Sequence, residues 1–206
     1  MAKSPKKITK QTKIWGSDLD IVLPINGPDI ANFDKWVNWR GYTQNHRGFD
    51  FAAYLTKDKR CVLGLPSETP IRAVADGVVK QISQGLAEYY QYATFINIAH
   101  GKEDSGMFSC YHHVEPLVEP NQPVKKGDII AILYKDPGNY KGKLVHLHFE
   151  LTNGWDIKNR YVDPISIFPI LAGYNAEPQY KQKFKISGIK KQPRISIANF
   201  RNLRIE

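Results

Sequence analysis

The sequence predicts an all-β protein, a compact antiparallel sheet or barrel-like domain with basic extensions at both ends. Short apolar segments recur between turn-forming residues, and helical periodicity is weak throughout the chain. The best-defined segment, 143–151, alternates polar and apolar side chains in the manner of a half-buried strand. With 206 residues, 42% of them hydrophobic, the chain is long enough for one sizeable core.

The predicted strands follow one another between residue 21 and Pro164, which ends the run. Each is bounded by turn formers, and together they cover 21–23, 71–74, 78–82, 94–100, 107–114, 129–134 and 143–151. The Asp76-Gly77 pair favours a hairpin turn between 71–74 and 78–82. A second hairpin is expected to join 94–100 to 107–114.

Charge divides the chain into a basic arm at 1–20, a domain at 21–170 and a basic extension at 171–206. Residues 1–13 hold five lysines and no acid, and residues 175–206 hold eight Lys or Arg against two Glu. Subtracting these charges from the net +9 leaves −2 for the part between them. The basic ends therefore indicate an anionic polymer or surface as a partner, with a merely solubilising role as the alternative.

The chain shows no apolar run near the ~20 residues of a transmembrane helix. Its lysine-rich start is not followed by the apolar stretch of a secretory signal. We expect an extracytoplasmic location (periplasm, cell wall or secreted) if a leader has been removed, and a cytoplasmic one stays open. Cys61 and Cys110 are 49 positions apart, so one disulfide or two buried thiols are equally compatible with the sequence.

The strand at 143–151 has one chemical face and one apolar face. Alternation places Leu144, His146, His148 and Glu150 together, opposite Val145, Leu147, Phe149 and Leu151. Two imidazoles at i and i+2 lie roughly 7 Å apart along a strand. One can bind a metal ion while the other faces the group that the metal activates.

A second motif, His46-Arg47-Gly48-Phe49-Asp50, pairs an imidazole with a carboxylate. These two side chains cannot meet across a fully extended strand, because i to i+4 spans about 13 Å. Gly48 allows the backbone between them to bend, so that both can bind one cation. A capped turn with an exposed His and Asp is the alternative when this motif is taken alone.

A third motif is Tyr111-His112-His113-Val114. Strand alternation puts Ser109, Tyr111 and His113 on one face of 107–114, and we expect Tyr111 and His113 at the cleft. His112 is then a packed or rim residue. His100, at the end of its predicted strand, is expected to make a structural hydrogen bond rather than to bind metal.

Together the three motifs supply the parts of a metal-dependent catalytic site. Three N and O ligands with an open fourth position are typical of catalytic zinc. Further histidines beside such a site can transfer protons and stabilise an oxyanion.

The order and spacing of these motifs resemble the lysostaphin-type zinc metallopeptidases, peptidoglycan endopeptidases that include the LytM-type autolysins. The resemblance covers about residues 21–168. The matching stretches are Trp39-Arg40, His46 to Asp50, Pro70 to Val79, Ile98 to Gly101, Tyr111 to Val114, Val124 to Ile130, His146 to Glu150 and Asp163-Pro164. The chain departs from the family in an insertion at 54–68 and in Val145, where the family often has proline.

The resemblance implies the family's duplicated hybrid fold and a role for each site residue. His46, Asp50 and His148 correspond to the ligands of one Zn²⁺ ion, and His113 and His146 correspond to the catalytic histidines. Arg40, Tyr42 and Tyr111 are expected to bind substrate. Glu150 is expected to lie outside the ligand set, since a fourth protein ligand would close the open position.

The implied function is hydrolysis of peptide bonds in peptidoglycan stems or cross-links. One alternative is a catalytically silent module that binds cell wall or regulates other wall hydrolases, and another is a zinc peptidase with a non-wall peptide substrate. The expected partners are peptidoglycan or another peptide, together with an anionic surface at the basic ends. Nucleic acid is not expected.

Overall fold

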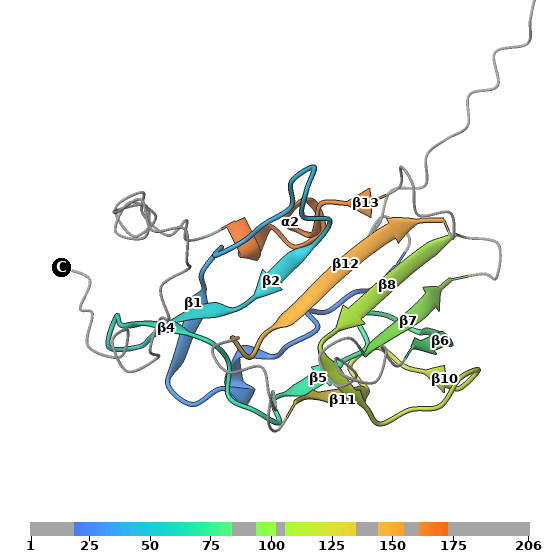
Figure 1. The fold of residues 1–206 in the computed structure, drawn as a ribbon, viewed down its shortest axis with the longest axis horizontal. Coiled ribbons are helices and arrows are strands. Elements are labelled where there is room, and N and C mark those ends of the chain that lie inside the picture. The colour runs from blue at the N-terminus through green and yellow to red at the C-terminus, as the bar shows by residue number, and fades with distance from the viewer. Residues whose placement is uncertain (1–18, 84–93, 102–105, 135–143, 155–160, 173–206) are drawn as a thin grey trace, which may run out of the picture.

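The computed structural model describes residues 19–83, 94–101, 106–134, 144–154 and 161–172. Within them the fold is almost entirely antiparallel β-structure (Figure 1), which confirms the predicted class. The strands are β1 (Phe33–Trp36), β2 (Phe49–Phe51), β3 (Ala53–Thr56), β4 (Cys61–Leu63), β5 (Pro70–Arg72), β6 (Gly77–Ser83), β7 (Phe95–His100), β8 (Met107–His112), β9 (Val114–Pro116), β10 (Pro123–Val124), β11 (Ile129–Leu133), β12 (Leu147–Asn153) and β13 (Tyr161–Val162). The helices are η1 (Gly27–Asp29), α2 (Pro164–Ile167) and η3 (Pro169–Ala172).

The largest sheet has the order β10-β6-β7-β8-β12-β13, and β2 also pairs with β12. Strand β8 runs along one edge of β12, and the other edge is shared by two short strands. Strand β2 pairs with the first half of that edge, at Leu147 to Phe149, and β13 pairs further along, at Leu151 and Thr152. Two three-stranded sheets, β1-β3-β4 and β5-β11-β9, complete the described fold.

Strand β12 has the two faces that the sequence predicts. Leu147, Phe149 and Leu151 are each 0% exposed, whereas His148 and Glu150 on the opposite face are half-buried. The strand begins at Leu147 rather than at residue 143. His146 therefore lies one position before it, still on the side of His148.

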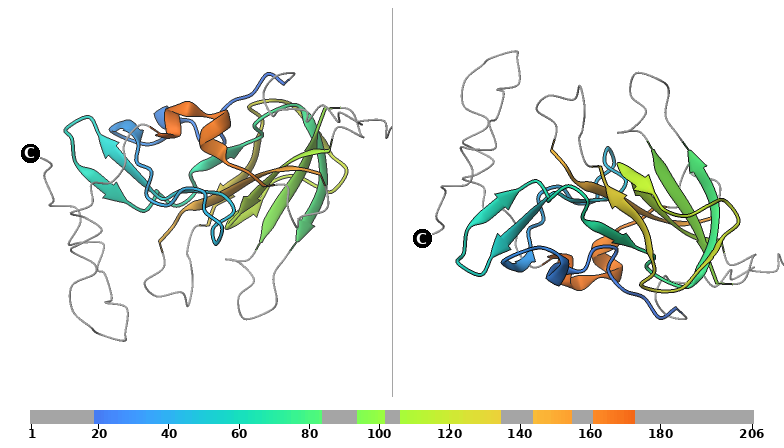
Figure 2. Two further views of the ribbon diagram at one scale, coloured as in Figure 1. Left: turned by 90° about the horizontal axis from the view of Figure 1, so that it is seen from above. Right: turned by 90° about the horizontal axis from the view of Figure 1, so that it is seen from below.

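The apolar face of β12 belongs to an aromatic-rich core. The Phe149 ring lies 5.3 Å from that of Tyr111, 6.2 Å from that of Phe51 and 6.4 Å from that of Phe168, between centroids. Phe168 follows α2, which lies on one side of β12 (Figure 2). Burying each such side chain contributes about 1.5–3 kcal/mol. Because the helices cover the apolar face, the histidine face of β12 is the one left for a site.

One predicted hairpin is confirmed and the other is wrong. Strands β7 and β8 pair from Phe95↔His112 to His100↔Met107. Strands β5 and β6, on either side of Asp76-Gly77, belong to different sheets. The Asp76 carboxylate instead accepts hydrogen bonds from the backbone N–H of Lys126, at 2.8 Å, and from Lys125 Nζ, at 2.9 Å, so this turn links two sheets.

The structure also bears on what the sequence predicts for residues 54–68, the two cysteines, membrane-spanning helices and the basic ends. Residues 54–68, expected to be an insertion, hold most of the β3–β4 hairpin, and both Cys61 and Cys110 are free thiols. In the described part of the chain, no helix has the length and apolar character needed to cross a membrane. The basic stretches at 1–18 and 173–206 lie outside the described residues.

Candidate active site

A tight turn ahead of β2 orients His46. Thr43 and His46 exchange two backbone hydrogen bonds, at 2.8 and 3.1 Å. The His46 Nδ1–H group donates to the carbonyl oxygen of Gly41 at 2.9 Å, which directs Nε2 towards Asp50 Oδ1 at 3.1 Å. The backbone thus selects the ring nitrogen that faces the carboxylate.

Asp50 reaches the site because β2 alternates. Phe49 and Phe51 are 0% exposed in the core, and Asp50 between them points to the opposite face, where it is 5% exposed. Gly48 makes this approach possible, since a Cβ atom there would stand 2.3 Å from the carbonyl oxygen of Phe149. Close contact of two backbones, and not only freedom to bend, therefore requires glycine at this position.

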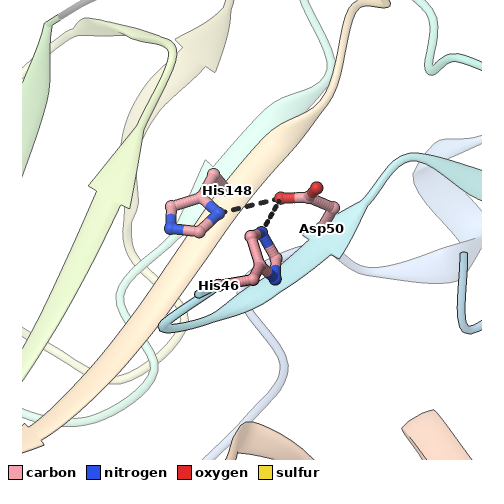
Figure 3. Close-up of side chains that lie close together, drawn as sticks. All are labelled: His46, Asp50 and His148. Carbon is pink, nitrogen blue, oxygen red and sulfur yellow. Dashed lines mark hydrogen bonds and ion pairs between the residues drawn. The ribbon is translucent and has the colours of Figure 1, made fainter. Parts of the chain in front are cut away.

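His148 lies directly opposite Asp50 in the β2–β12 pairing. Its Nδ1 is 2.8 Å from Asp50 Oδ1, its Nε2 is 3.0 Å from Glu150 Oε1, and its ring centroid is 4.7 Å from that of His46. One ligand atom from each of His46, Asp50 and His148 lies within 4.8 Å of the other two. The three side chains converge from β2, the turn ahead of it and β12 (Figure 3), so one metal ion could contact all of them.

The charges of this cluster are strongly coupled. Burial alone would raise the pKa of Asp50, but hydrogen bonds from His148 and His46 outweigh it and hold that pKa well below the usual range. Burial alone would lower the pKa of His148, but hydrogen bonds to Asp50 and Glu150 raise it to about 9. Without metal, a proton on His148 therefore takes the place of a cation beside the carboxylates.

A second pair of histidines faces the first cluster. His146 Nδ1–H donates to the carbonyl oxygen of Leu144 at 2.8 Å, and its ring lies 4.7 Å from that of His113. Burial lowers the pKa of His146, so its imidazole is neutral at neutral pH. His146 Nε2 is 3.7 Å from Asp50 Oδ1, which places this pair beside the His46, Asp50 and His148 cluster.

His113 enters the pocket by leaving the strand. Strand β8 ends at His112, and His113 adopts a φ of +66°, in the left-handed region. This change breaks the alternation, so that adjacent residues His112 and His113 both line the pocket. His112 was expected to be a packed or rim residue away from the cleft, but the face that it shares with Cys110 is the one that lines the pocket.

The expectation that Tyr111 lies at the cleft is wrong. Ser109 and Tyr111 point into the core and are 0% exposed, while Cys110 and His112 share the face of His148. The Tyr111 hydroxyl accepts a hydrogen bond from the Val74 N–H at 3.0 Å. Tyr111 thus joins β8 to the chain after β5 and cannot touch a substrate.

His100 has the structural role predicted for it. Its Nδ1 lies 3.0 Å from the Asp76 carbonyl oxygen, and its Nε2 lies 2.7 Å from Ser109 Oγ. Desolvation lowers its pKa to about 4, so the buried ring is neutral. It binds the β7–β8 hairpin to the turn at Asp76 and lies outside the histidine cluster.

The histidine clusters line a pocket of about 610 Å³. Its walls are formed by Trp39, Arg40, His46, Asp50, Ala52, His112, His113, Leu144, His146 and His148. Arg40 lines the pocket as expected, with Nη1 3.9 Å from Asp50 Oδ2 and a side chain 61% exposed. Tyr42, also expected to bind substrate, is 38% exposed and is not among the lining residues.

Trp39, Ala52 and Leu144 also line the pocket, although the sequence assigned none of them a role in the site. The alternation of 143–151 already put Leu144 on the histidine face. Trp39 adjoins Arg40, yet no periodicity marks it as a pocket residue.

The fold and site define an antiparallel β-protein with a His-Asp-His cluster that could hold a metal ion and two further histidines in one pocket. A model of peptidase family M23 matches residues 44–164, which is more than half of the chain. The chain belongs to this family.

Solved structures similar to this chain include lysostaphin and LytU. The solution structure of lysostaphin is 21% identical, with a TM-score of 0.48, and the match covers 71% of this chain and 54% of lysostaphin. The chain thus spans about half the length of that protein. LytU is 23% identical, with a TM-score of 0.46 and coverage of 67% and 84%. The catalytic domain of lysostaphin from Staphylococcus simulans is 16% identical, with a TM-score of 0.46 and coverage of 70% and 98%.

Proposed function

We propose that this protein is a zinc-dependent metalloendopeptidase that hydrolyses peptide bonds in the stems or cross-links of peptidoglycan. The observation that carries the proposal is the convergence of His46, Asp50 and His148 in one pocket with His113 and His146. Membership of peptidase family M23 supports peptide-bond hydrolysis. Peptidoglycan as the substrate rests on the resemblance of the motifs to lysostaphin-type enzymes.

The donor set fits zinc. We assign His46 Nε2, Asp50 and His148 Nδ1 as ligands, a set of two imidazoles and one carboxylate that suits this borderline metal. Glu150 Oε1 accepts a hydrogen bond from His148 Nε2 at 3.0 Å. A hydrogen-bond partner of this kind fixes the orientation of a metal-binding histidine. When bound, zinc supplies Lewis-acid activation of water and of the scissile carbonyl.

His146 and His113 are the residues proposed to move protons and to bind the developing oxyanion. The neutral ring of His146 donates through Nδ1 to Leu144, so Nε2 is the nitrogen suited to accept a proton. His113, across a 4.7 Å ring separation, is suited to donate a hydrogen bond to the oxyanion or a proton to the leaving amine.

The exposed guanidinium of Arg40 is proposed to bind the substrate. It lies at the pocket wall and carries a positive charge close to Asp50. Peptide carbonyl and carboxylate oxygens are the groups such a fork recognises. An Arg40→Ala variant is therefore expected to raise KM more than it lowers kcat.

The test combines metal analysis with a digestion assay. Purified protein is expected to contain one zinc ion per chain in this site and to release soluble fragments with new amino groups from purified peptidoglycan. His113→Ala and His146→Ala should retain the zinc of this site and lose the release. Equal release by the wild type and both variants would refute the enzymatic proposal.

The alternatives give different results in the same assays. Binding to peptidoglycan without release of fragments, by a protein that lacks metal under zinc-replete conditions, would indicate a silent wall-binding module. A zinc-containing protein that leaves peptidoglycan intact but cleaves an unrelated peptide library in a His146-dependent way would indicate a non-wall substrate.

A further inference from the structure

A second group of metal-binding side chains lies next to the histidine pocket. The β8–β12 register pairs Cys110 with Glu150 and His112 with His148, so these four residues form a square on one face of the sheet. His148 belongs to the first cluster through Asp50. The other three, Cys110, His112 and Glu150, each offer one ligand atom, and these atoms all lie within 4.8 Å of one another.

The distances in this group suit a tetrahedral ion. Cys110 Sγ is 3.2 Å from His112 Nε2, and His112 Nε2 is 3.6 Å from Glu150 Oε2. Bonds of the usual lengths to zinc put neighbouring tetrahedral ligands about 3.3–3.6 Å apart. Thiolate, imidazole and carboxylate are also the three ligand types that zinc takes in proteins. Two of the three separations therefore match tetrahedral spacing, and all three atoms lie within 4.8 Å of one another.

Glu150 can serve both clusters because its two oxygens face different partners. Oε1 accepts a hydrogen bond from His148 Nε2 at 3.0 Å, and Oε2 faces His112. One carboxylate can therefore orient His148 and still offer an oxygen to an ion beside His112.

An unsatisfied oxygen lies on the same face of the sheet. Asn97 is directly opposite Cys110 in the β7–β8 pairing, so Asn97, Cys110 and Glu150 form a row across three strands. The buried Oδ1 of Asn97 has no hydrogen-bond partner among the described residues. Such an atom is uncommon in a folded protein and indicates a missing partner such as an ordered water or an ion.

We propose that Cys110, His112 and Glu150 form a second metal site, which takes a borderline or soft divalent cation such as Zn²⁺. The site is distinct from the His46, Asp50 and His148 cluster and does not depend on the function proposed for it. Asn97 is positioned to hold the fourth ligand, a water molecule. Oxygen-seeking cations such as Mg²⁺ are excluded by the thiol and imidazole donors.

The thiol makes this site distinguishable from the first one. Cys110 Sγ lies 3.2 Å from His112 Nε2, within hydrogen-bonding distance. Binding must displace the proton of this thiol, since a thiolate is the metal ligand. A metal–sulfur signal can come only from a cysteine, and the first cluster contains none.

The proposal is tested by titrating the metal-free full-length chain with Co²⁺ under reducing conditions. The wild type is expected to bind a second equivalent that gives the near-ultraviolet charge-transfer absorption of a thiolate–cobalt bond. Cys110→Ser should abolish that absorption and leave a single equivalent. Competition with Zn²⁺ should remove the absorption from the wild type.

Matched variants identify the site. Cys61→Ser removes the other cysteine, in strand β4, and should retain the full absorption. His46→Ala removes a ligand of the first cluster and should also retain it. Circular dichroism monitors the fold of each variant, and His112→Gln provides a second disruption of the site if Cys110→Ser does not fold.

The outcomes separate this proposal from the proposed function. No charge-transfer absorption in the wild type, or one that persists in both Cys110→Ser and His112→Gln, overturns the second site. A wild type that binds only one equivalent, with absorption lost in Cys110→Ser and kept in His46→Ala, supports the second site. The same result would refute the first site as a metal centre.

Discussion

Asp50 concentrates the electrostatics of the pocket on one oxygen. Its Oδ1 lies 3.1 Å from His46 Nε2, 2.8 Å from His148 Nδ1 and 3.7 Å from His146 Nε2. The negative charge of this carboxylate is balanced either by a proton on a neighbouring imidazole or by a metal ion. Asp50 is therefore the residue that decides whether the pocket binds metal.

Replacing Asp50 with Asn keeps the shape of the side chain and removes its charge. We expect Asp50→Asn to weaken zinc binding at this cluster about a hundredfold or more, since loss of even an outer partner costs 10–100-fold. Zinc titration against a competing chelator measures the change. Asp34→Asn, which alters an exposed partner of Lys59, is the control and should bind as the wild type does. Tight binding by both variants would exclude Asp50 as a ligand.

The affinity for zinc should depend on pH through His148. Its pKa without metal is about 9, whereas a metal ligand must be the neutral imidazole. Below that pKa zinc competes with a proton, so the affinity should rise about tenfold per pH unit between roughly pH 6.5 and 8.5. Calorimetry in buffers of different ionisation enthalpy would count the proton released. An affinity that is constant over this range would contradict the raised pKa.

His100 should make the fold sensitive to acid. Its pKa is about 4 when folded and 6.5 for the ordinary group, so between these values the unfolded chain binds more protons. The stability therefore falls as pH decreases from 6.5 towards 4, by up to about 3 kcal/mol from this group. Urea unfolding of the wild type and His100→Gln at several pH values tests this. The variant should be less stable at neutral pH and show a shallower loss in acid.

At the scale of elements, the site depends on a strand pair held at close range. Gly48→Ala would place a Cβ atom 2.3 Å from the Phe149 carbonyl oxygen, and backbone cannot yield as a side chain can. We expect β2 to shift away from β12, with a loss of about 2 kcal/mol or more in unfolding free energy and weaker zinc binding. Thermal unfolding with and without zinc measures both effects.

Gly41→Ala is the matched control for Gly48→Ala. The nearest atoms to its Cβ would belong to the side-chain amide of Asn38, at 3.0 Å from Oδ1, and a side chain yields more readily than backbone. If Gly48→Ala has the same unfolding temperature and zinc affinity as Gly41→Ala, the close approach of the two strands is not required.

Period-two alternation was sufficient to predict the faces of β12 because that strand is regular from Leu147 to Asn153. It failed at β8, where His113 leaves the strand with a positive φ and turns back to the side of His112. Nothing in the local sequence predicts the positive φ of His113. The resemblance gave the role expected of His113, while the residue pattern alone assigned Tyr111 to the wrong face.

The sequence pattern also could not predict which strands pair with each other. The Asp76-Gly77 turn was a sound local prediction, but a turn does not fix whether its flanking strands pair. Two lysine contacts with Asp76 and a hydrogen bond from Val74 to Tyr111 decide the actual arrangement. These contacts join segments tens of residues apart, which no short window of sequence contains.

At the scale of the whole molecule, the basic charge lies at the ends of the chain. Removal of 175–206, which carries eight Lys or Arg and two Glu, should weaken binding to anionic cell-wall polymer. The effect should be largest at low salt and small near 1 M, where the screening length is about 3 Å. Cosedimentation with purified cell walls over a salt series measures it. If removal of 175–206 leaves binding at low salt unchanged, this basic segment has only a solubilising role.

The three proposed zinc ligands come from two segments far apart in the chain. Asp50 and His148 are 98 positions apart, on an edge where β2 contributes only Phe49–Phe51. An ion held between them acts as a removable cross-link that closes a long loop and favours the folded chain. Free zinc concentration would then set how often the β2 edge opens, so chelation should expose this segment to proteases before the rest of the large sheet.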